Sequence, residues 1–427
     1  MTKEKNVDIS VDLCGIKMKN PLIVASGPYG RSGPAIKDIT IPRADPVGAV
    51  DTKLIPTRWM PQMTRYMGPA TAWAIHKIRP GTKEKYPSEG YSQLAMVAGI
   101  KLSAEQWLEG DFAMAVEAGK EAGVPIFVNG PSVLTAPFIL DMFGTTEDKE
   151  IERMAELASK FEQQGAAAVQ ALFHLSFQPG YAWTNWSIMP KIMSSLKKAV
   201  KIPVMAKTLY HPSYVEEVVK PLEAAGADAI ICTGFVRSSD VDIELARPSF
   251  TAEVAEIDIT GAHQKPVAMN CVARCVNSGV KIPVIAAGGS FSARDVIAFV
   301  MLGASCVQLT TVAMFKGLSV FKRIDKDIRS WLDAHGYKSL DDIRGIALEK
   351  WGDLELKALD NIRVEVDEAS CNGCGICARY CFETLKGAIT VVDGVAKIDQ
   401  EKCERCTFCS VLCPEQAISV KGWPSEG

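Results

Sequence analysis

The sequence predicts an α/β fold in two parts, a (β/α)8 TIM barrel followed by a small α+β domain. Short apolar runs alternate with helix-like stretches along most of the chain, and eight such runs can be counted. Near-continuous apolar strands that alternate with helices are typical of a parallel sheet, and eight units close a barrel. The end of the chain is different, since it holds eight of the thirteen cysteines.

A glycine or a proline marks the start of most predicted strands. Gly165, Gly226 and Gly303 each follow a helix-like stretch, where a left-handed residue commonly ends a helix. Pro125 and Pro203 open apolar runs, and a strand tolerates proline at its first residue. The predicted strands lie near residues 23, 50, 127, 170, 205, 230, 285 and 308. An open, doubly wound sheet is the alternative, but no G-x-G-x-x-G follows the first strand.

Composition and charge are those of an ordinary soluble protein. The 427 residues are 48% hydrophobic and 23% charged, with a formal net charge of −3. Without a basic excess, neither nucleic acid nor an anionic membrane is an expected partner. The charged N-terminus precedes no apolar core, and no run approaches the roughly 18 apolar residues of a membrane span. We therefore expect a soluble, cytoplasmic protein.

Two interlocked C-x2-C-x2-C-x3-C runs predict two [4Fe–4S] clusters. The runs are Cys371, Cys374, Cys377 and Cys381, then Cys403, Cys406, Cys409 and Cys413. In two-cluster ferredoxins the fourth cysteine of each run ligates the other cluster. We therefore expect Cys413 to complete the cluster of the first run and Cys381 to complete the cluster of the second. Residues 365–422 resemble the bacterial two-cluster ferredoxin domain.

The spacing of the cysteines also leaves zinc as a rival ligand. Pairs of the form C-x2-C bind zinc, but zinc sites usually close with two pairs or with histidine. No histidine follows His335, which favours iron–sulfur clusters. Gly373 and Gly375 would let the first loop wrap closely and aim backbone N–H groups at sulfur.

The patterns divide the chain into three segments. Residues 1–317 are expected to form the barrel, 318–362 a helical linker, and 363–427 the ferredoxin-like domain. Ile324, Ile328 and Leu332 recur at helical spacing within the linker.

Residues at the predicted strand ends form a candidate anion site. Barrel enzymes work at the C-terminal ends of the strands, with a phosphate site after strands seven and eight. Here these strands end in Gly288-Gly289 and Thr310-Thr311, whose amides and hydroxyls can donate to a phosphate. Lys53 and Lys207 end strands two and five, where a lysine is also often merely solvated. Two lysines in one barrel mouth would need an anion or an electron-rich ring to offset their repulsion.

Several motifs follow one another in a specific order. They are Ile9-Ser-Val-Asp-Leu-Cys-Gly-Ile-Lys-Met-Lys-Asn-Pro-Leu-Ile-Val-Ala-Ser-Gly27, Asp51-Thr-Lys53, Pro203-Val-Met-Ala-Lys207, Thr260-Gly-Ala-His-Gln-Lys-Pro266, Ala287-Gly-Gly289 and the cysteine-rich tail. With this order the chain resembles the flavin/iron–sulfur subunit of bacterial NAD-dependent dihydropyrimidine dehydrogenases, and more broadly the dihydroorotate dehydrogenase barrels. The resemblance implies FMN in the barrel mouth, in addition to the two clusters.

The resemblance also implies which residues bind the flavin. By position these are Ala25, Ser26 and Gly27 at the isoalloxazine, Lys53 and Lys207 at the ring and ribityl chain, Gly261 through its backbone, and Gly288, Gly289, Thr310 and Thr311 at the phosphate. A cation near the ring stabilises the reduced, anionic flavin.

The substrate site departs from the pattern of that family. The family places an Asn and then a catalytic Cys or Ser after strand four, where this chain has Leu172 and Leu175. A second family Asn is Gly234, and residues 90–95 show none. In the family these side-chain amides hydrogen-bond the imide edge of a pyrimidine. Their loss therefore favours a different, non-pyrimidine substrate.

The implied chemistry is hydride transfer between the flavin and one carbon of a C=C bond next to a carbonyl, with a general acid at the neighbouring carbon. His174 is the first candidate for the acid, because its pKa suits proton transfer near neutrality, and Ser176 is the second. A structural histidine is the alternative reading of His174. Aromatic residues crowd the same loop, which favours a flat or apolar cyclic substrate.

Two functions stay open at this point. The first is an enzyme acting on CH–CH groups, a true dihydropyrimidine dehydrogenase being one version of it. Its clusters would exchange electrons with a separate FAD/NAD(P)-binding subunit or a ferredoxin, since the chain shows no nicotinamide fingerprint. The second is an electron-transfer subunit of a larger complex without its own substrate. The resemblance implies a homodimer or a larger hetero-oligomer.

Overall fold

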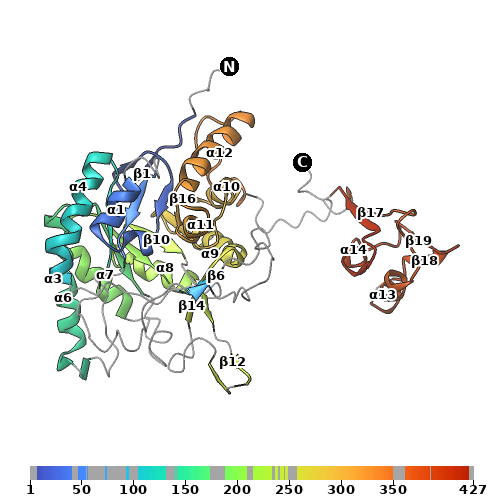
Figure 1. Ribbon diagram of the computed structural model, residues 1–427, viewed down its shortest axis with the longest axis horizontal. Helices are drawn as coiled ribbons and strands as arrows, with labels where there is room; N and C mark the ends of the chain where they lie inside the picture. The colour runs from blue at the N-terminus through green and yellow to red at the C-terminus, as the bar shows by residue number, and fades with distance from the viewer. Residues whose placement is uncertain are drawn as a thin grey trace. The chain divides into compact units, whose positions relative to one another are not determined.

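The computed structural model divides the chain into two compact units, each described here by itself (Figure 1). Unit 1 is Met1–Glu349 and unit 2 is Lys350–Gly427. The structure describes residues 7–40, 47–53, 55, 73–74, 93–95, 104–130, 140–141, 143–173, 188–208, 215–232, 236–238, 241–244, 246–248, 257–349, 361–384 and 386–422.

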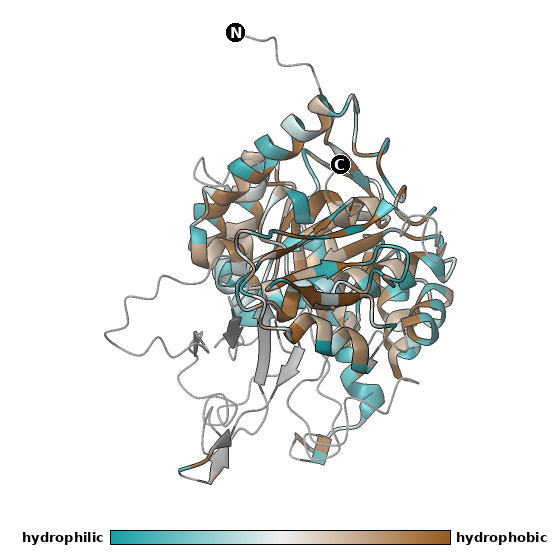
Figure 2. Ribbon diagram, turned by 90° about the vertical axis from the view of Figure 1, so that its right-hand side faces the viewer, coloured by the Kyte–Doolittle hydropathy of each residue, from teal (hydrophilic) through white to brown (hydrophobic). Residues whose placement is uncertain are grey.

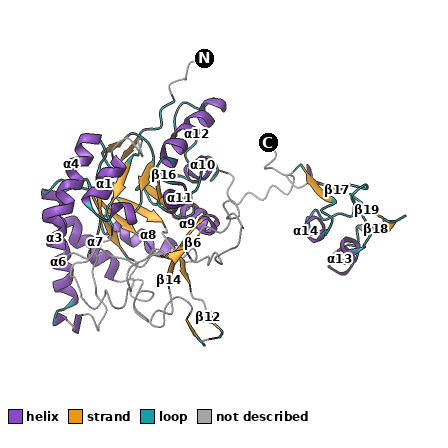
Figure 3. Ribbon diagram, in the orientation of Figure 1, coloured by secondary structure: helices purple, strands orange, loops and turns teal. Residues whose placement is uncertain are grey.

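Eight parallel strands close into a barrel in unit 1 (Figure 3). In chain order they are β3 (Leu22–Val24), β4 (Ala49–Asp51), β7 (Ile126–Asn129), β8 (Ala168–Leu172), β9 (Val204–Lys207), β10 (Ala229–Cys232), β15 (Val284–Ala287) and β16 (Ala304–Leu309). Each strand pairs with the next one along the chain, and β16 pairs with β3 to close the barrel. Every strand lies at its predicted position, so the (β/α)8 fold is confirmed.

The glycines before the strands have the conformation that the sequence predicts. Gly165, Gly226 and Gly303 have φ angles of +103°, +98° and +91°, which a residue with a Cβ adopts only with strain. They end the helices and turn the chain into β8, β10 and β16.

Helices cover the outside of the barrel. The main ones are α1 (Gly33–Thr40), α4 (Ala113–Ala122), α6 (Glu147–Gln163), α7 (Ile188–Ala199), α8 (Val215–Ala224), α9 (Lys265–Asn277), α10 (Ala293–Met301), α11 (Thr311–Lys316) and α12 (Val320–Ala334). In α6, Ile151, Met154, Ala158 and Phe161 recur at helical spacing and are buried. In Figure 2 the central strands are largely brown, the colour of hydrophobic residues. No helix in the described ranges combines the length and the apolar character needed to cross a bilayer.

Helix α12 lies in the segment that the sequence predicts as a linker. Its residues Ile324, Ile328 and Leu332 are buried, as their spacing predicts, and they belong to the hydrophobic core of unit 1. The structure therefore places the first part of the 318–362 segment on the barrel, and the two units divide after Glu349.

Besides the barrel, the described residues of unit 1 form three further sheets that were not predicted. One is a hairpin of β1 (Val11–Leu13) and β2 (Ile16–Met18), and another is the antiparallel pair β12 (Val241–Asp242) and β13 (Arg247–Pro248). The third is antiparallel, with the order β11 (Val236–Ser238), β14 (Ile257–Gly261), β6 (Gln93–Ala95) and β5 (Trp73–Ala74). It joins segments that lie far apart in the sequence, a pairing that local sequence patterns do not specify.

Unit 2 is a small α+β unit. It contains the antiparallel pairs β17 (Arg363–Val366) with β20 (Ile418–Lys421), and β18 (Ile389–Val392) with β19 (Val395–Ile398), and the helices α13 (Ile376–Thr384) and α14 (Phe408–Leu412). Its core is small and includes three cysteines, Cys377, Cys381 and Cys409. A unit of this size usually needs a bound metal group or another staple to be stable.

Candidate active site and cysteine cavities

The loops at the ends of β3 and β16 are packed against each other. The backbone N–H of Ala25 donates to the carbonyl of Leu309 at 3.0 Å, and the hydroxyl of Thr310 donates to the carbonyl of Ala25 at 2.9 Å. A Cβ on Gly27 would lie 2.4 Å from Cγ2 of Thr310, so this approach requires glycine. The structure thus brings the predicted residues of the first and eighth strand ends together.

The glycine pair after β15 lies against the start of α9. Gly288 and Gly289 have φ angles of +104° and +83°. A Cβ on Gly289 would lie 2.4 Å from the backbone N of Lys265. Next to this contact the hydroxyls of Thr260 and Thr311 lie 2.8 Å apart. Gly261, Gly288, Gly289, Thr310 and Thr311 therefore belong to one cluster of strand ends, with the N-terminus of α9 beside them.

Polar side chains without partners lie in the same segments. Ser290 is 5% exposed and Gln264 is 1% exposed, yet Ser290 Oγ and Gln264 Nε2 have no hydrogen-bond partner among the described residues. Both ring nitrogens of His263 are also buried and unpartnered there. Burial lowers the pKa of His263, so the ring is neutral near pH 7. Buried polar atoms are normally hydrogen-bonded, so these residues fit a ligand with many oxygens.

A polar network crosses the barrel interior at its C-terminal end. Nε2 of Gln170 donates to Oδ1 of Asp51 at 2.6 Å, and Nε2 of Gln308 donates to Oδ2 of Asp51 at 2.7 Å. Oε1 of Gln308 accepts from Nζ of Lys207 at 2.8 Å. These side chains come from β4, β8, β9 and β16, which are not all neighbours, so they can meet only inside the barrel.

Burial shifts the pKa of both charged groups of this network. The pKa of Asp51 is raised to about 7 by burial, against the opposing effects of Lys207, Gln170 and the backbone N–H of Ser26. The pKa of Lys207 is lowered by burial, and Asp51 acts in the opposite direction. Both shifts have the same cause, the cost of holding a charge away from water.

The register of the strands places two further side chains inside the barrel mouth. Asn129 is level with Gln170, and Leu172 is level with Lys207. Paired residues of neighbouring strands point to the same side of a sheet, so Asn129 and Leu172 face the interior as well. Both are buried, and the Asn129 Oδ1 and Gln170 Oε1 atoms have no partner among the described residues.

Several other predicted residues can be placed only in part. Lys53 follows β4, and its backbone N–H donates to the carbonyl of Gly30 at 2.7 Å. The candidate acids His174 and Ser176 lie outside the described residues, as do Leu175 and Gly234.

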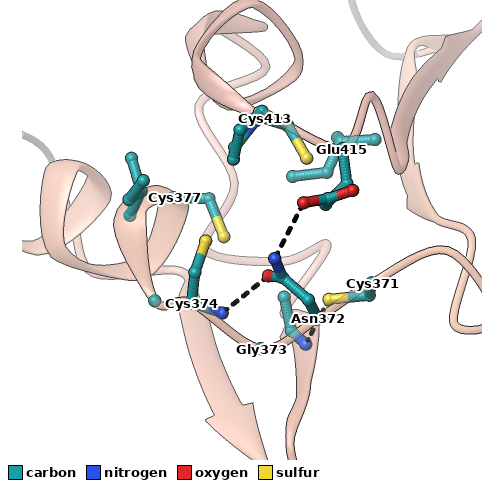
Figure 4. Close-up of a pocket in the computed structure, with 12 residues that line it drawn as sticks. Cys371, Asn372, Gly373, Cys374, Cys377, Cys413 and Glu415 are labelled. Atoms are coloured by element: carbon teal, nitrogen blue, oxygen red, sulfur yellow. Dashed lines mark hydrogen bonds between the residues drawn. The ribbon is translucent and has the colours of Figure 1, made fainter.

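In unit 2, four cysteines surround one cavity (Figure 4). They are Cys371, Cys374 and Cys377 from the first run and Cys413 from the second. The amide of Asn372 links the two parts of the wall, since it accepts from the backbone N–H of Cys374 at 3.1 Å and donates to Glu415 at 2.9 Å. The space between these residues is about 340 Å³, a volume that includes solvent at its open side.

The remaining cysteines line a second cavity. Cys381, Cys403, Cys406 and Cys409 lie around it, together with Cys377 and with charged residues that include Lys386, Lys402 and Glu404. Burial and then the neighbouring thiols raise the pKa of Cys409 to about 11. A thiol that holds its proton in this way releases it when a metal binds the sulfur.

Backbone N–H groups point at sulfur in both loops. The N–H groups of Ala396 and Ala417 donate to Cys371 and Cys413 at 3.5 and 3.3 Å. Those of Ala388 and Arg405 donate to Cys381 and Cys403 at 3.2 and 3.4 Å. Such N–H groups stabilise the negative charge of a cluster and tune its potential. The donor set of each cavity, four thiols with amides behind them, fits an iron–sulfur cluster.

The residues at the barrel mouth likewise fit FMN, on different grounds. The glycine pair leaves a cradle that a Cβ would fill, and the atoms of Ser290 and Gln264 are unpartnered beside it. Among the described residues, the interior offers the cation of Lys207 and the unpartnered acceptor oxygens Asn129 Oδ1 and Gln170 Oε1. When bound, FMN supplies hydride and single-electron chemistry that side chains lack.

Sequence reasoning missed part of this site. Four polar residues of mostly apolar strands were not proposed as functional: Asp51, Asn129, Gln170 and Gln308. In a barrel, polar residues toward the C-terminal ends of the strands can line the mouth. This pattern was the feature of the sequence that could have identified these four residues. His263 and Gln264 carry no such signal, because only burial shows that their polar atoms have no partner.

Comparison with known proteins agrees with both units. The family model "Dihydroorotate dehydrogenase" matches residues 182–332, and the model "4Fe-4S binding domain" matches residues 396–419. The catalytic subunit of dihydroorotate dehydrogenase B (NAD(+)) from Methanocaldococcus jannaschii is 26% identical over 345 residues, which is 80% of this chain and 98% of the relative. The corresponding subunit from Pyrococcus horikoshii is 32% identical over 217 residues, 50% of this chain and 69% of the relative.

The relatives support the broader of the two resemblances inferred from sequence. The similar proteins are archaeal dihydroorotate dehydrogenase B subunits, so the broader of the two groups named there is supported, and the bacterial dihydropyrimidine dehydrogenase subunit is not singled out. Barrel, motifs and matches together show that the chain belongs to the dihydroorotate dehydrogenase family, as an FMN-dependent oxidoreductase acting on CH–CH groups that carries an additional 4Fe–4S unit.

Proposed function

We propose that this oxidoreductase acts on a C=C or CH–CH bond next to a carbonyl in a small cyclic substrate other than a pyrimidine. Leu172 carries the proposal. It is 5% exposed, faces the barrel interior and is level with Lys207 at the mouth. An apolar side chain there favours an apolar edge of the substrate, since it cannot hydrogen-bond an imide.

The residues of the mouth have distinct proposed roles. Lys207 and Lys53 would lie at the flavin ring and ribityl chain, with Ala25, Ser26 and Gly27 against the isoalloxazine. The backbone of Gly261 and the strand ends Gly288-Gly289 and Thr310-Thr311 would hold the phosphate. His174 or Ser176 would give or take the proton at the substrate carbon next to the one that exchanges hydride.

The clusters are proposed to connect the barrel to another protein. In this assignment one [4Fe–4S] cluster is held by Cys371, Cys374, Cys377 and Cys413, and the other by Cys381, Cys403, Cys406 and Cys409. The similar proteins are named as catalytic subunits, which supports a separate electron-transfer partner for this chain too. That partner would be an FAD/NAD(P)-binding subunit or a ferredoxin, within a homodimer or a larger hetero-oligomer.

The substrate class can be tested by oxidation of the reduced protein. The holoprotein is reduced anaerobically and mixed with orotate, with uracil, or with cyclic enones such as cyclohexenone, and the return of the oxidised flavin absorbance is timed. The proposal expects the enones to oxidise the flavin and the two pyrimidines to fail. Rapid oxidation by orotate or uracil would overturn it.

The variant Leu172→Asn adds a second arm to this experiment. It introduces an amide where the family has one, so it should improve the response to pyrimidines relative to enones. Leu157→Met, on the outside of the barrel in α6, is the control and should leave the ratio unchanged.

A second candidate function is electron transfer without a substrate. Leu172 supports this function as well. A barrel mouth without an amide side chain at this position to hydrogen-bond the substrate fits a barrel that no longer binds a pyrimidine. In that case no small compound would oxidise the reduced flavin, whereas a one-electron acceptor would do so through the clusters.

A further inference from the structure

We propose that Asp51 is a positioning residue of the flavin site, which fixes the Lys207 ammonium through Gln308 and places a second charge under the mouth. The inference rests on the proposed function only in placing FMN beside Lys207. It does not depend on the substrate, and its test contains none.

The geometry of Gln308 allows one arrangement of this chain of groups. An ionised carboxylate only accepts hydrogen bonds and an ammonium only donates them. Gln308 meets both requirements at once, with Nε2 toward Asp51 at 2.7 Å and Oε1 toward Lys207 at 2.8 Å. Its amide orientation is therefore dictated by the two charges, and in turn it fixes the position of Nζ.

Each hydrogen bond of the network matters because the four side chains that form it are buried. Asp51 and Gln170 have no exposed surface, Gln308 is 3% exposed and Lys207 is 6% exposed. A buried charge needs a partner and hydrogen bonds, or it becomes neutral. Asp51 supplies the opposite charge for Lys207, and Lys207 does the same for Asp51.

Few other groups face Asp51. From β8 it meets the neutral amide of Gln170, and from β16 the neutral amide of Gln308. From the loop after β3 it meets the backbone N–H of Ser26, and Lys207 from β9 is the charged group acting on it. The register places Phe127 of β7 beside it. Among the described residues, burial and Lys207 thus have the largest effects on the charge state of Asp51, and the hydrogen bonds from Gln170 and Ser26 act in the same direction as Lys207.

The hydrogen bond from the backbone N–H of Ser26 connects Asp51 directly to the loop that is proposed to contact the flavin. Ser26 lies in the segment 25–27 that is packed against Thr310. Asp51 therefore contacts, directly or through one amide, both a residue assigned to the isoalloxazine and a lysine assigned to the ring. A negative charge there opposes the gain of negative charge on reduction, and protonation of Asp51 removes that opposition.

The experiment compares the reduction potential of the bound FMN in the wild type and in Asp51→Asn between pH 5.5 and pH 8.5. The full-length holoprotein is equilibrated with reference dyes without substrate, and the clusters are followed separately by EPR. Above pH 7 the potential of the variant should be more positive, because the wild type carries the Asp51 charge there. Below pH 6 the two potentials should converge, since Asp51 is then protonated.

Controls separate this role from a purely structural one. Asp325 is also a buried acid, bonded to Asn20 and Arg329 at 3.0 Å each, but Asn20 precedes β3 at the opposite end of the barrel. Asp325→Asn should leave the potential unchanged at every pH. Potentials of wild type and Asp51→Asn that coincide throughout, or differ by the same amount at every pH, would overturn the proposal.

A second variant covers the possibility that Asp51→Asn does not fold. Asp51→Ser removes the charge with a smaller side chain, and the same convergence below pH 6 is expected. Failure of the substrate experiment would leave these potentials untouched, so the two hypotheses fail separately.

Discussion

At the scale of single residues, the barrel interior shows how an ordinary side chain acquires a special role from its position. Gln308 and Gln163 have the same side chain. Gln163 is exposed on α6, with a contact to Ser159 at 3.5 Å, whereas Gln308 bridges two buried charges. The different consequences of losing these two amides can be measured.

Replacing Gln308 by Leu should lower the free energy of unfolding of the FMN-free protein by about 1–3 kcal/mol. The substitution leaves Oδ2 of Asp51 and Nζ of Lys207 without their partner in the interior, and an unsatisfied buried polar group costs about this much. Urea denaturation monitors the loss. Gln163→Ala is the matched control and should change the stability by less than about 0.5 kcal/mol. Equal effects of the two substitutions would contradict the bridging role.

Asp51 also predicts the pH dependence of stability. Its pKa in the folded protein is about 7, above the ordinary value of 3.8 for an aspartate. Its contribution to stability is therefore complete below pH 4 and is lost as the pH rises toward 7, because the folded state holds the proton more tightly. In Asp51→Asn this decline should be absent, so the stability of the variant relative to the wild type should rise between pH 4 and pH 7. Urea titrations of both FMN-free proteins test this, and parallel curves would contradict it.

At the scale of elements, the two cysteine loops are repeats of one backbone conformation. In the first loop Gly373 and Gly375 have φ angles of +66° and +76°. The equivalent residues of the second loop, Arg405 and Thr407, have φ angles of +57° and +63° although they carry a Cβ. The loop shape therefore follows from the cysteine spacing, and glycine relieves strain in only one of the copies.

The two glycines of the first loop should differ sharply when replaced by alanine. A Cβ on Gly373 would lie 2.3 Å from the carbonyl O of Gly394, whereas a Cβ on Gly375 has no atom within 4 Å. Gly375→Ala should therefore bear only the backbone strain of about 1–2 kcal/mol and keep both clusters. Gly373→Ala should move the chain away from β19 and lose the cluster of the first cavity.

Iron content and EPR of the purified variants decide between these outcomes. About half of the wild-type iron is expected in Gly373→Ala, and all of it in Gly375→Ala. Full iron content in both variants would show that the clash at Gly394 is relieved without opening the cavity.

At the scale of the whole molecule, the proposed function requires electrons to pass from the barrel to the cysteine-rich unit. Replacing Cys409 by Ser removes a thiol that lines the second cavity. Anaerobic reduction of the flavin by a substrate should be unchanged in this variant, because the barrel is intact. Transfer to an external one-electron acceptor should fall at least tenfold. Stopped-flow absorbance separates the two phases, and Cys271→Ser, at a buried position of α9 in unit 1, is the control. Unchanged transfer would mean that electrons leave the flavin directly.

The architecture was predictable because it is periodic. All eight barrel strands were located from apolar runs, and for most of them from the glycine or proline before them as well, which reflect local backbone preferences and burial on both faces. The antiparallel sheet of β5, β6, β11 and β14 was not predicted, because its strands come from segments far apart in the chain. The packing of α12 on the barrel was missed for a related reason, since helical spacing shows that a face is buried but not against what.

The sequence by itself determined the family, the barrel and the grouping of the cysteines expected at each cluster, because these depend on spacing and repetition along the chain. Only the tertiary structure decided which polar residues act together inside the barrel. Asp51, Gln170, Lys207 and Gln308 lie at least 37 positions apart in the sequence. What joins them is the closure of the sheet, which turns alternate side chains of four strands into one buried space. Closure also removes water, and that makes a carboxylate, an amine and two amides a single coupled group.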